Sequence, residues 1–268
     1  MTGALERWRA DLGAWAIPDQ IRAAVRDSPW DLPRGSFTNR AKRMVAAPGG
    51  PSYERARDAL PPGGSVLDVG CGAGAASLPL APIAGTIVGV DESDDMLAAF
   101  RSVSTIPVTT VTGGWPGVAD QIEPADVVVC HHVLYNVADL GRFADALTVH
   151  ARRRVVVEMT ARHPMSGLNP LWERLHHLPR PDRPTADDAV EALGEIGLDV
   201  ATEHWSTAAS TDFGTYEDML AVTARRLCLP ADRIGELDEA LRDLGVDPAV
   251  PRLGSTRDLV TLWWDGAA

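Results

Sequence analysis

Three glycines stand at alternate positions after a short apolar run, in the stretch VLDVGCGAGA of residues 66–75. Glycine permits positive φ angles in a tight turn and lets backbone N–H groups approach a ligand closely. Twenty-one residues after Gly70, the run IVGVD ends in Asp91. An acid about 20 residues beyond such glycines is placed to accept hydrogen bonds from two ribose hydroxyls. The spacing predicts a nucleotide-like ligand; the alternative is a strand-to-helix turn with nothing bound.

A second stretch, CHHVLYN at residues 130–136, brings together side chains that suit proton chemistry. Open parallel sheets bind ligands outside the carboxyl ends of their strands, where this stretch is expected to lie. A histidine with a pKa near neutrality suits the removal of a proton, so His131 and His132 are candidate bases. They are adjacent, so at most one should point into the crevice. Tyr135 is a candidate hydrogen-bond partner for a substrate. Each of the three has an alternative structural role.

Further along, four residues are candidates for binding a substrate. Glu158 ends an apolar run and is expected to line the crevice or to pair with an arginine of the run before it, and His163 follows. The helix-like segment NPLWERLHH puts Trp172 and His176 four residues apart on one face. That face is expected to close over a substrate or to pack on the N-terminal segment. Half of a carboxylate-bridged metal motif occurs here without its second copy, so no metal is expected.

These residues need a sheet to position them. Short β-branched runs alternate with helical stretches, which is typical of parallel strands joined by crossover helices. The predicted strands are residues 65–69, 86–91, 108–112, 126–130, 153–159, 198–205 and 258–264. The helices with readable periodicity are residues 93–104, 138–151 and 185–197, and a further helix is expected to begin within 75–83. The predicted fold class is α/β, with a doubly wound, mostly parallel, seven-stranded sheet.

Two regions fall outside this repeating unit and give the predicted domain organisation. Residues 1–60 are expected to form a helical extension or lid, and residues 206–257 a helical insertion that caps the sheet. The predicted α/β core is residues 61–205, completed by residues 258–268 as its final edge strand.

Composition limits the classes of function. The chain has 268 residues, of which 45% are apolar and 23% charged, as in soluble globular proteins. A net charge of −12 repels nucleic acid and anionic lipid surfaces, so we expect a small-molecule partner and neither nucleic acid nor membrane. Three cysteines without paired spacing and the absence of an export signal point to the cytoplasm. The oligomeric state stays open.

Three motifs together resemble a known family. VLDVGCGAG, IVGVDESDDML and ADVVVCHHVLYNV are similar to the successive motifs of the class I S-adenosylmethionine-dependent methyltransferases, over roughly residues 60–205. The resemblance implies that the glycine turn holds the amino-acid portion of the cofactor. It also implies that Asp68 helps to position the cofactor's amino group and that Asp91 binds the ribose. The family's sheet ends with an antiparallel edge strand, which we assign to the run DLVTLWWD.

The sequence departs from the family in one place. Many relatives carry an acid after the third strand, where this chain has Thr112-Gly-Gly-Trp-Pro116. Trp115 is expected either to stack on the adenine or to fill a gap beneath the loop. Glu92 is expected to contact the ribose or to stand in solvent. The full set of predicted cofactor-binding residues is Asp68, Gly70, Cys71, Gly72, Gly74, Asp91, Glu92, Met96, Gly114, Trp115 and His131.

The leading hypothesis is an S-adenosylmethionine-dependent methyltransferase that acts on a small molecule with some apolar bulk and releases S-adenosylhomocysteine. The alternatives are an RNA methyltransferase, a cofactor-binding protein without transfer activity, and an NAD-dependent oxidoreductase. The looser dinucleotide pattern at Gly70, Gly72 and Ala75 supports the oxidoreductase. Asp68 and the CHHVLYNV segment fit the methyltransferase pattern better.

Overall fold

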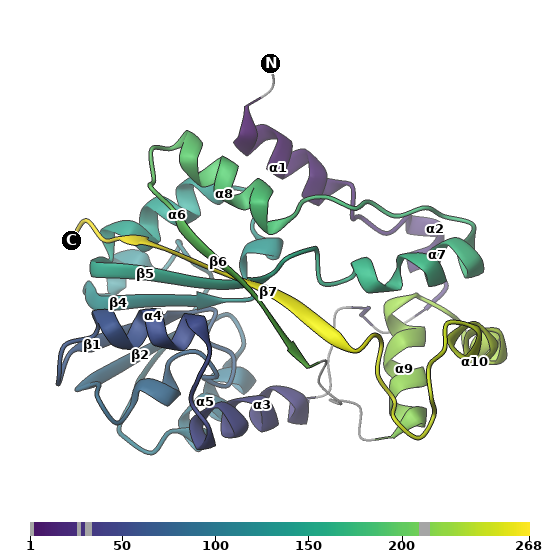
Figure 1. Cartoon of the computed structure of the whole chain (residues 1–268), viewed down its shortest axis with the longest axis horizontal. Helices are drawn as coiled ribbons and strands as arrows, with labels where there is room; N and C mark the ends of the chain where they lie inside the picture. The colour runs from purple at the N-terminus through teal and green to yellow at the C-terminus, as the bar shows by residue number, and fades with distance from the viewer. Residues whose placement is uncertain (1–2, 26–27, 30–33, 209–214) are drawn as a thin grey trace.

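The computed structural model describes residues 3–25, 28–29, 34–208 and 215–268. One seven-stranded sheet carries helices on both faces (Figure 1). Its strands are β1 (Ser65–Val69), β2 (Thr86–Asp91), β3 (Thr109–Thr112), β4 (Ala125–His131), β5 (Ala151–Thr160), β6 (Ala201–Ala208) and β7 (Thr256–Asp265). Their order across the sheet is β3-β2-β1-β4-β5-β7-β6. Strands β1 to β5 pair in parallel, which confirms the predicted fold class.

The last strand is not at the edge, and that prediction for residues 258–268 is wrong. Strand β7 lies between β5 and β6 and pairs antiparallel with both. The reason is visible in the two sequences. DLVTLWW in β7 supplies apolar residues to both faces and is largely buried, whereas ATEHWSTA in β6 is mostly polar and solvent-exposed. A largely polar strand tolerates the open edge, and an apolar one gains from an interior position.

Each face of the sheet has its own apolar cluster. One face packs on the helices α1, α6 and α8 through residues such as Trp8, Phe143 and Leu193. The other packs on α3, α4 and α5 through residues such as Ala41 and Phe100. The bounds are α1 (Ala4–Gly13), α6 (Leu140–Val149), α8 (Ala186–Glu195), α3 (Arg34–Ala46), α4 (Pro51–Ala59) and α5 (Asp94–Val103). Both faces of the central strands are therefore buried.

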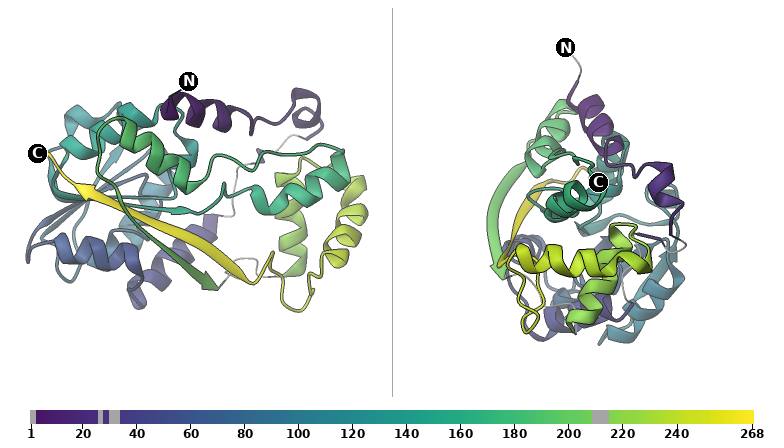
Figure 2. Two further views of the ribbon diagram at one scale, coloured as in Figure 1. Left: turned by 45° about the horizontal axis from the view of Figure 1, so that its top comes forward. Right: turned by 90° about the vertical axis from the view of Figure 1, so that its right-hand side faces the viewer.

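The remaining helices form a cap beyond the carboxyl ends of the parallel strands (Figures 1 and 2). They are α2 (Asp19–Arg22), α7 (Asn169–His176), α9 (Tyr216–Arg226) and α10 (Ile234–Asp243). The cap has its own apolar cluster, in which Trp15 from the N-terminal segment joins Leu171, Met219 and Leu237. No helix among the described residues is long and apolar enough to cross a membrane.

The segment after the glycine turn differs from prediction. Residues 75–83 form turns and one short 3-10 helix, η1 (Leu78–Leu80), where a longer helix is expected from the sequence. Pro79 and Pro82 explain the difference, because each lacks a backbone N–H and disfavours continuation of a helix. The other predicted helices match α5, α6 and α8 to within a few residues.

Candidate active site

The glycine turn follows β1 at the centre of the sheet. Gly70, Gly72 and Gly74 all have positive φ, at 69°, 50° and 90°. The backbone N–H groups of Gly70 and Cys71 both donate to the carbonyl oxygen of Val90, at 2.9 Å. A Cβ added at Gly70 would strike Val133, whereas a Cβ at Gly72 would meet no atom within 4 Å. Gly72 therefore borders open space, as expected where a ligand approaches the backbone.

Asp91 ends β2 beside this turn. Its Oδ2 accepts the Gly72 N–H at 2.9 Å, and its Oδ1 accepts the Ser93 N–H at 2.9 Å. These bonds fix the carboxylate at the mouth of the glycine turn, and each oxygen retains a lone pair for a further donor. The geometry fits a ribose diol.

Asp68 lies below the turn and is 1% exposed. Its Oδ2 accepts the Ser77 hydroxyl at 2.6 Å, while its buried Oδ1 has no hydrogen-bond partner among the residues described. Burial raises the pKa of Asp68 to about 7, against the lowering effect of Ser77. An unpartnered buried carboxylate oxygen is costly and suits a donor such as a ligand ammonium group.

The predicted adenine side is more loosely defined. Glu92 is exposed, and its Oε1 lies close to Gly114, at 2.4 Å from the position that a Cβ would take there. Trp115 packs edge-on against His150, with ring centroids 4.9 Å apart, and borders the apolar cluster of α6. Met96 lies half-buried on α5, where its N–H donates to the Ser93 hydroxyl. Trp115 thus contacts the core and stays a prediction as a stacking residue.

Cys71 turns its side chain away from the open space. Its sulfur lies 3.0 Å from where a Cβ would stand at Gly89 and belongs to the cluster under α5. Burial raises the pKa of the Cys71 thiol well above its usual value. The backbone of Cys71, and not its thiol, therefore shapes the turn.

His131 ends β4 opposite Glu158 in the register of β5. Its Nε2 is buried and has no hydrogen-bond partner in the described part of the chain. Burial lowers the pKa of His131, Glu158 opposes this change, and Arg40 reinforces it. The imidazole is therefore neutral near pH 7.

His132 belongs to a compact group with Glu158 and Arg40 of α3. The Nε2 atom of His132 lies 3.0 Å from Glu158 Oε1 and 2.6 Å from Arg40 Nη2. Burial lowers the pKa of His132 to about 4. Burial works to raise the pKa of Glu158, but the two histidines and Arg40 hold that pKa well below its usual range. At neutral pH the group contains an anion, a cation and a neutral imidazole.

Tyr135 has a structural position. Its hydroxyl donates to the carbonyl oxygen of Thr160 at 2.9 Å, and its ring stacks on Trp8. Burial raises the pKa of Tyr135 above its usual value. Its hydroxyl proton is used on the backbone and its ring holds α1 to the core, and a catalytic role for Tyr135 stays a prediction.

The three other predicted substrate residues pack within the protein. Trp172 is 2% exposed and contacts His176, whose Nε2 lies 2.7 Å from the carbonyl oxygen of Leu227. His163 stacks on Trp15, with ring centroids 3.8 Å apart. These residues build the cap and join it to the core, so of the four predicted substrate residues only Glu158 lies in the group at the ends of β4 and β5.

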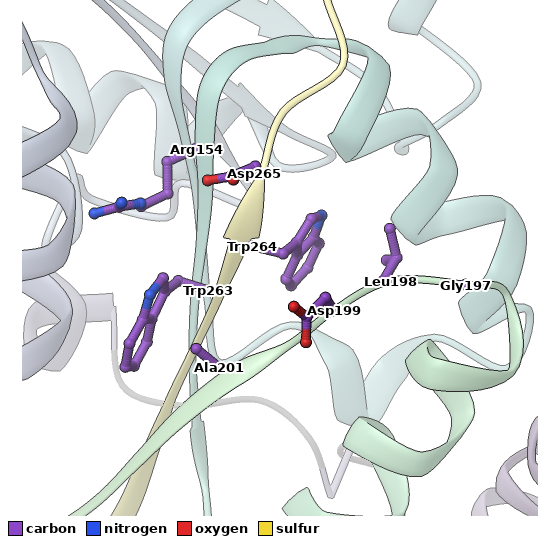
Figure 3. Close-up of a pocket in the computed structure, with 8 residues that line it drawn as sticks. All are labelled: Arg154, Gly197, Leu198, Asp199, Ala201, Trp263, Trp264 and Asp265. Atoms are coloured by element: carbon purple, nitrogen blue, oxygen red, sulfur yellow. The ribbon is translucent and has the colours of Figure 1, made fainter.

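A hollow of about 370 Å³ lies at the opposite end of the sheet, where β5 and β6 begin and β7 ends (Figure 3). It is lined by Arg154, Gly197, Leu198, Asp199, Ala201, Trp263, Trp264 and Asp265. None of the predicted site residues lies there, and parallel sheets bind their ligands at the other edge. We therefore place the candidate site at the glycine turn. No group of acids, histidines and cysteines suited to a metal occurs among the described residues.

Comparisons with known proteins agree with this site. A sequence model of the methyltransferase-domain family matches residues 66–153. An uncharacterized protein of Haemophilus influenzae is 34% identical over 104 residues, which are 37% of this chain and 38% of that protein. The matched part therefore spans well under half of that relative's length.

Solved structures share the fold. The YcgJ protein from Bacillus subtilis superposes with a TM-score of 0.54 at 15% identity, covering 86% of this chain and 99% of that one. A candidate methyltransferase of Bacillus halodurans C-125 gives a TM-score of 0.53 at 16% identity, covering 84% and 100%.

Sheet, glycine turn and acid define a Rossmann-like protein built for a nucleoside-containing cofactor. Residues 66–153 match a methyltransferase domain, in agreement with the family resemblance of the sequence motifs. The matched domain and the shared fold agree with the predicted family, enzyme class and cofactor.

Sequence reasoning missed two residues that the structure places at the site. Ser77 donates to Asp68, and Arg40 reaches the strand ends from α3. Ser77 follows the glycine turn closely in the sequence, so its hydroxyl could have been identified from the sequence as a partner for Asp68. Arg40 is separated from Glu158 by 118 residues, and no local pattern marks that contact.

Proposed function

We propose that this methyltransferase transfers a methyl group from S-adenosylmethionine to a small molecule with some apolar bulk. The observation that carries the proposal is that the open space at Gly72 and the unpartnered Asp68 oxygen occur at the end of β1, which pairs in parallel with the strand that ends in His131. The helical cap supports a small acceptor, because it stands over the carboxyl edge of the sheet and has an apolar interior. We further propose that the enzyme acts in the cytoplasm, in line with its three buried free cysteines.

The residues of the site have separable tasks in this proposal. Asp91 accepts hydrogen bonds from the ribose, and Asp68 accepts one from the cofactor's ammonium group. The cofactor supplies a methyl carbon on a cationic sulfur, and the sulfur keeps the electron pair when the acceptor atom bonds that carbon. The acceptor loses a proton in the same process, and in this proposal His131 or His132, at the end of β4, receives it.

Calorimetry and a turnover assay test the proposal together. We expect the full chain to bind S-adenosylhomocysteine, and Asp91→Ala to weaken that binding by about 10- to 100-fold, since hydrogen bonds to a carboxylate contribute roughly 1.5–3 kcal/mol. Asp120→Ala, an exposed acid outside the site, is the control. S-adenosylhomocysteine release is then followed with a panel of small phenols, amines and carboxylic acids.

Each alternative has its own outcome. Turnover with RNA transcripts and not with small molecules would replace the proposed acceptor with RNA. Binding without turnover on any acceptor would favour a non-catalytic protein. Binding of NAD in place of both sulfur compounds would overturn the cofactor assignment itself. Full turnover in both His131→Ala and His132→Ala would exclude a histidine base at this edge.

A further inference from the structure

Arg40 is the charged side chain that the N-terminal segment contributes to the group it forms with His132 and Glu158. It lies on α3, in the N-terminal segment, and the matched domain is residues 66–153. About a third of its side chain is exposed, whereas Glu158 beside it is 9% exposed. Arg40 therefore links a buried carboxylate to the solvent-exposed surface.

The contacts of His132 Nε2 cannot all be made at once. Arginine stays protonated at neutral pH, so Arg40 Nη2 at 2.6 Å donates to the lone pair of Nε2. The proton of the neutral imidazole then resides on Nδ1, and neither nitrogen can act as a base. If Arg40 moved away, Nε2 would carry the proton and donate it to Glu158 Oε1, now 3.0 Å distant. Nδ1 would then offer a free lone pair, with a carboxylate behind it to stabilise the imidazolium.

Of the two partners, Arg40 is the one free to move. His132 has a φ of 61°, which is unfavourable for a non-glycine residue, and its N–H donates to the Glu158 carbonyl at 2.6 Å. The pairing of β5 with β4 likewise fixes the backbone of Glu158. Within the described part of the chain, Arg40 bonds its two partners through the single atom Nη2, at 2.6 Å from His132 and 3.3 Å from Glu158, on a long flexible side chain.

We propose that Arg40 recognises an anionic group on the methyl acceptor, and that its withdrawal from His132 makes Nδ1 of that imidazole the base. The inference rests on the proposed function and names the acceptor class for it. An anion competes for a guanidinium more strongly than a neutral acceptor does, and a carboxylate can engage it through two bonds where Glu158 uses one. The acceptor proton passes to His132 Nδ1 while the acceptor atom bonds the methyl carbon and the carbon–sulfur bond breaks. The other charged or titratable groups facing His132 are His131 on β4 and Arg257 on β7.

Nitrogen NMR of the full chain, labelled at histidine and bound to S-adenosylhomocysteine, tests this directly, with His132→Gln assigning the signal. We expect the Nδ1–H tautomer at pH 7 in the wild type. In Arg40→Gln we expect the Nε2–H tautomer and a His132 pKa raised by about one unit or more, since a neighbouring cation is removed. Lys42→Gln, an exposed change on the same helix, should match the wild type.

The acceptor class is tested with benzoate and inorganic phosphate as probes and benzamide as the neutral match. Either anion should convert wild-type His132 to the Nε2–H tautomer, while benzamide should not. In Arg40→Gln, none of the three probes should change the His132 tautomer. An Nε2–H tautomer in the wild type without probe overturns the proposal. So does a probe effect that survives in Arg40→Gln, or no effect of either anion at saturation. Loss of S-adenosylhomocysteine binding would instead count against the proposed function, because the tautomer in the absence of cofactor is read separately.

Discussion

At the scale of single residues, two glycines allow the need for a positive φ to be distinguished from the need for space beside the cofactor. Gly72 and Gly63 both have positive φ, at 50° and 73°, and a Cβ at either would meet no atom within 4 Å. They differ in place, because Gly72 borders the site and Gly63 precedes β1 at the other end of the sheet. A pair of alanine substitutions therefore carries the same kind of backbone strain with different exposure to the cofactor.

We expect both variants to lose about 1–2 kcal/mol in free energy of unfolding, the cost of a left-handed alanine. Only Gly72→Ala should lose affinity for S-adenosylhomocysteine, by more than about tenfold, because its methyl group enters space the cofactor needs. Urea titration and calorimetry on the same samples measure the two effects. Equal affinities in the two variants would move the cofactor away from Gly72.

At the scale of elements, the N-terminal segment spans both parts of the molecule. Trp8 is 1% exposed in the cluster under α1, stacks on Tyr135 and donates to the Val137 carbonyl at 2.8 Å. Trp15 belongs to the cap, stacks on His163 and donates to the Arg183 carbonyl at 2.6 Å. One short segment thus anchors the cap to the core.

Truncating each tryptophan to alanine should have different consequences. A buried tryptophan replaced by alanine costs about 3–5 kcal/mol. For Trp15→Ala we expect that loss in the amide-exchange protection of α9 and α10, with β4 and β5 little changed, since local stability differs across a structure. Trp8→Ala should lower protection everywhere. A uniform loss in Trp15→Ala would mean that the cap does not open by itself.

The helices and strands also show how much of the fold could be predicted from the sequence. Runs such as VVVC and RVVVEM identify strands buried on both faces, and the Ser93 and Thr185 caps locate α5 and α8, because these signals are local. Strand order is not local, so the interior place of β7 is understood only when its apolar run is compared with the polar run of β6. The contact of Arg40 with His132 has the same origin, since it forms only when α3 packs on the finished sheet.

At the scale of the whole molecule, stability should depend on pH through groups that titrate in opposite senses. Burial, followed by Arg180, lowers the pKa of His163 to about 4 from 6.5, so its contribution to stability is lost as pH falls through that range. Burial raises the pKa of Asp68 to about 7 from 3.8. Its contribution is present at low pH and lost as pH rises towards 7.

Two variants separate these contributions. Between pH 7 and 4, Asp68→Asn should lose stability more steeply on acidification than the wild type, because a compensating proton uptake is gone. His163→Phe keeps an aromatic ring against Trp15 and should lose stability less steeply, by up to about 3 kcal/mol across the range. Denaturant titrations at several pH values give both slopes. Parallel curves for all three proteins would contradict the assignment of either group.

The interior position of β7 has a consequence for how the protein is made. Until residues 256–265 are available, β5 lacks its antiparallel neighbour β7, and β6 has no partner in the sheet. On the ribosome, the emerging chain therefore carries an unpaired edge on β5 from the synthesis of that strand until β7 is made, and such edges invite pairing with other chains. The sheet reaches its final order only after translation has passed Asp265, so completion of the sheet is a late event in the making of the protein.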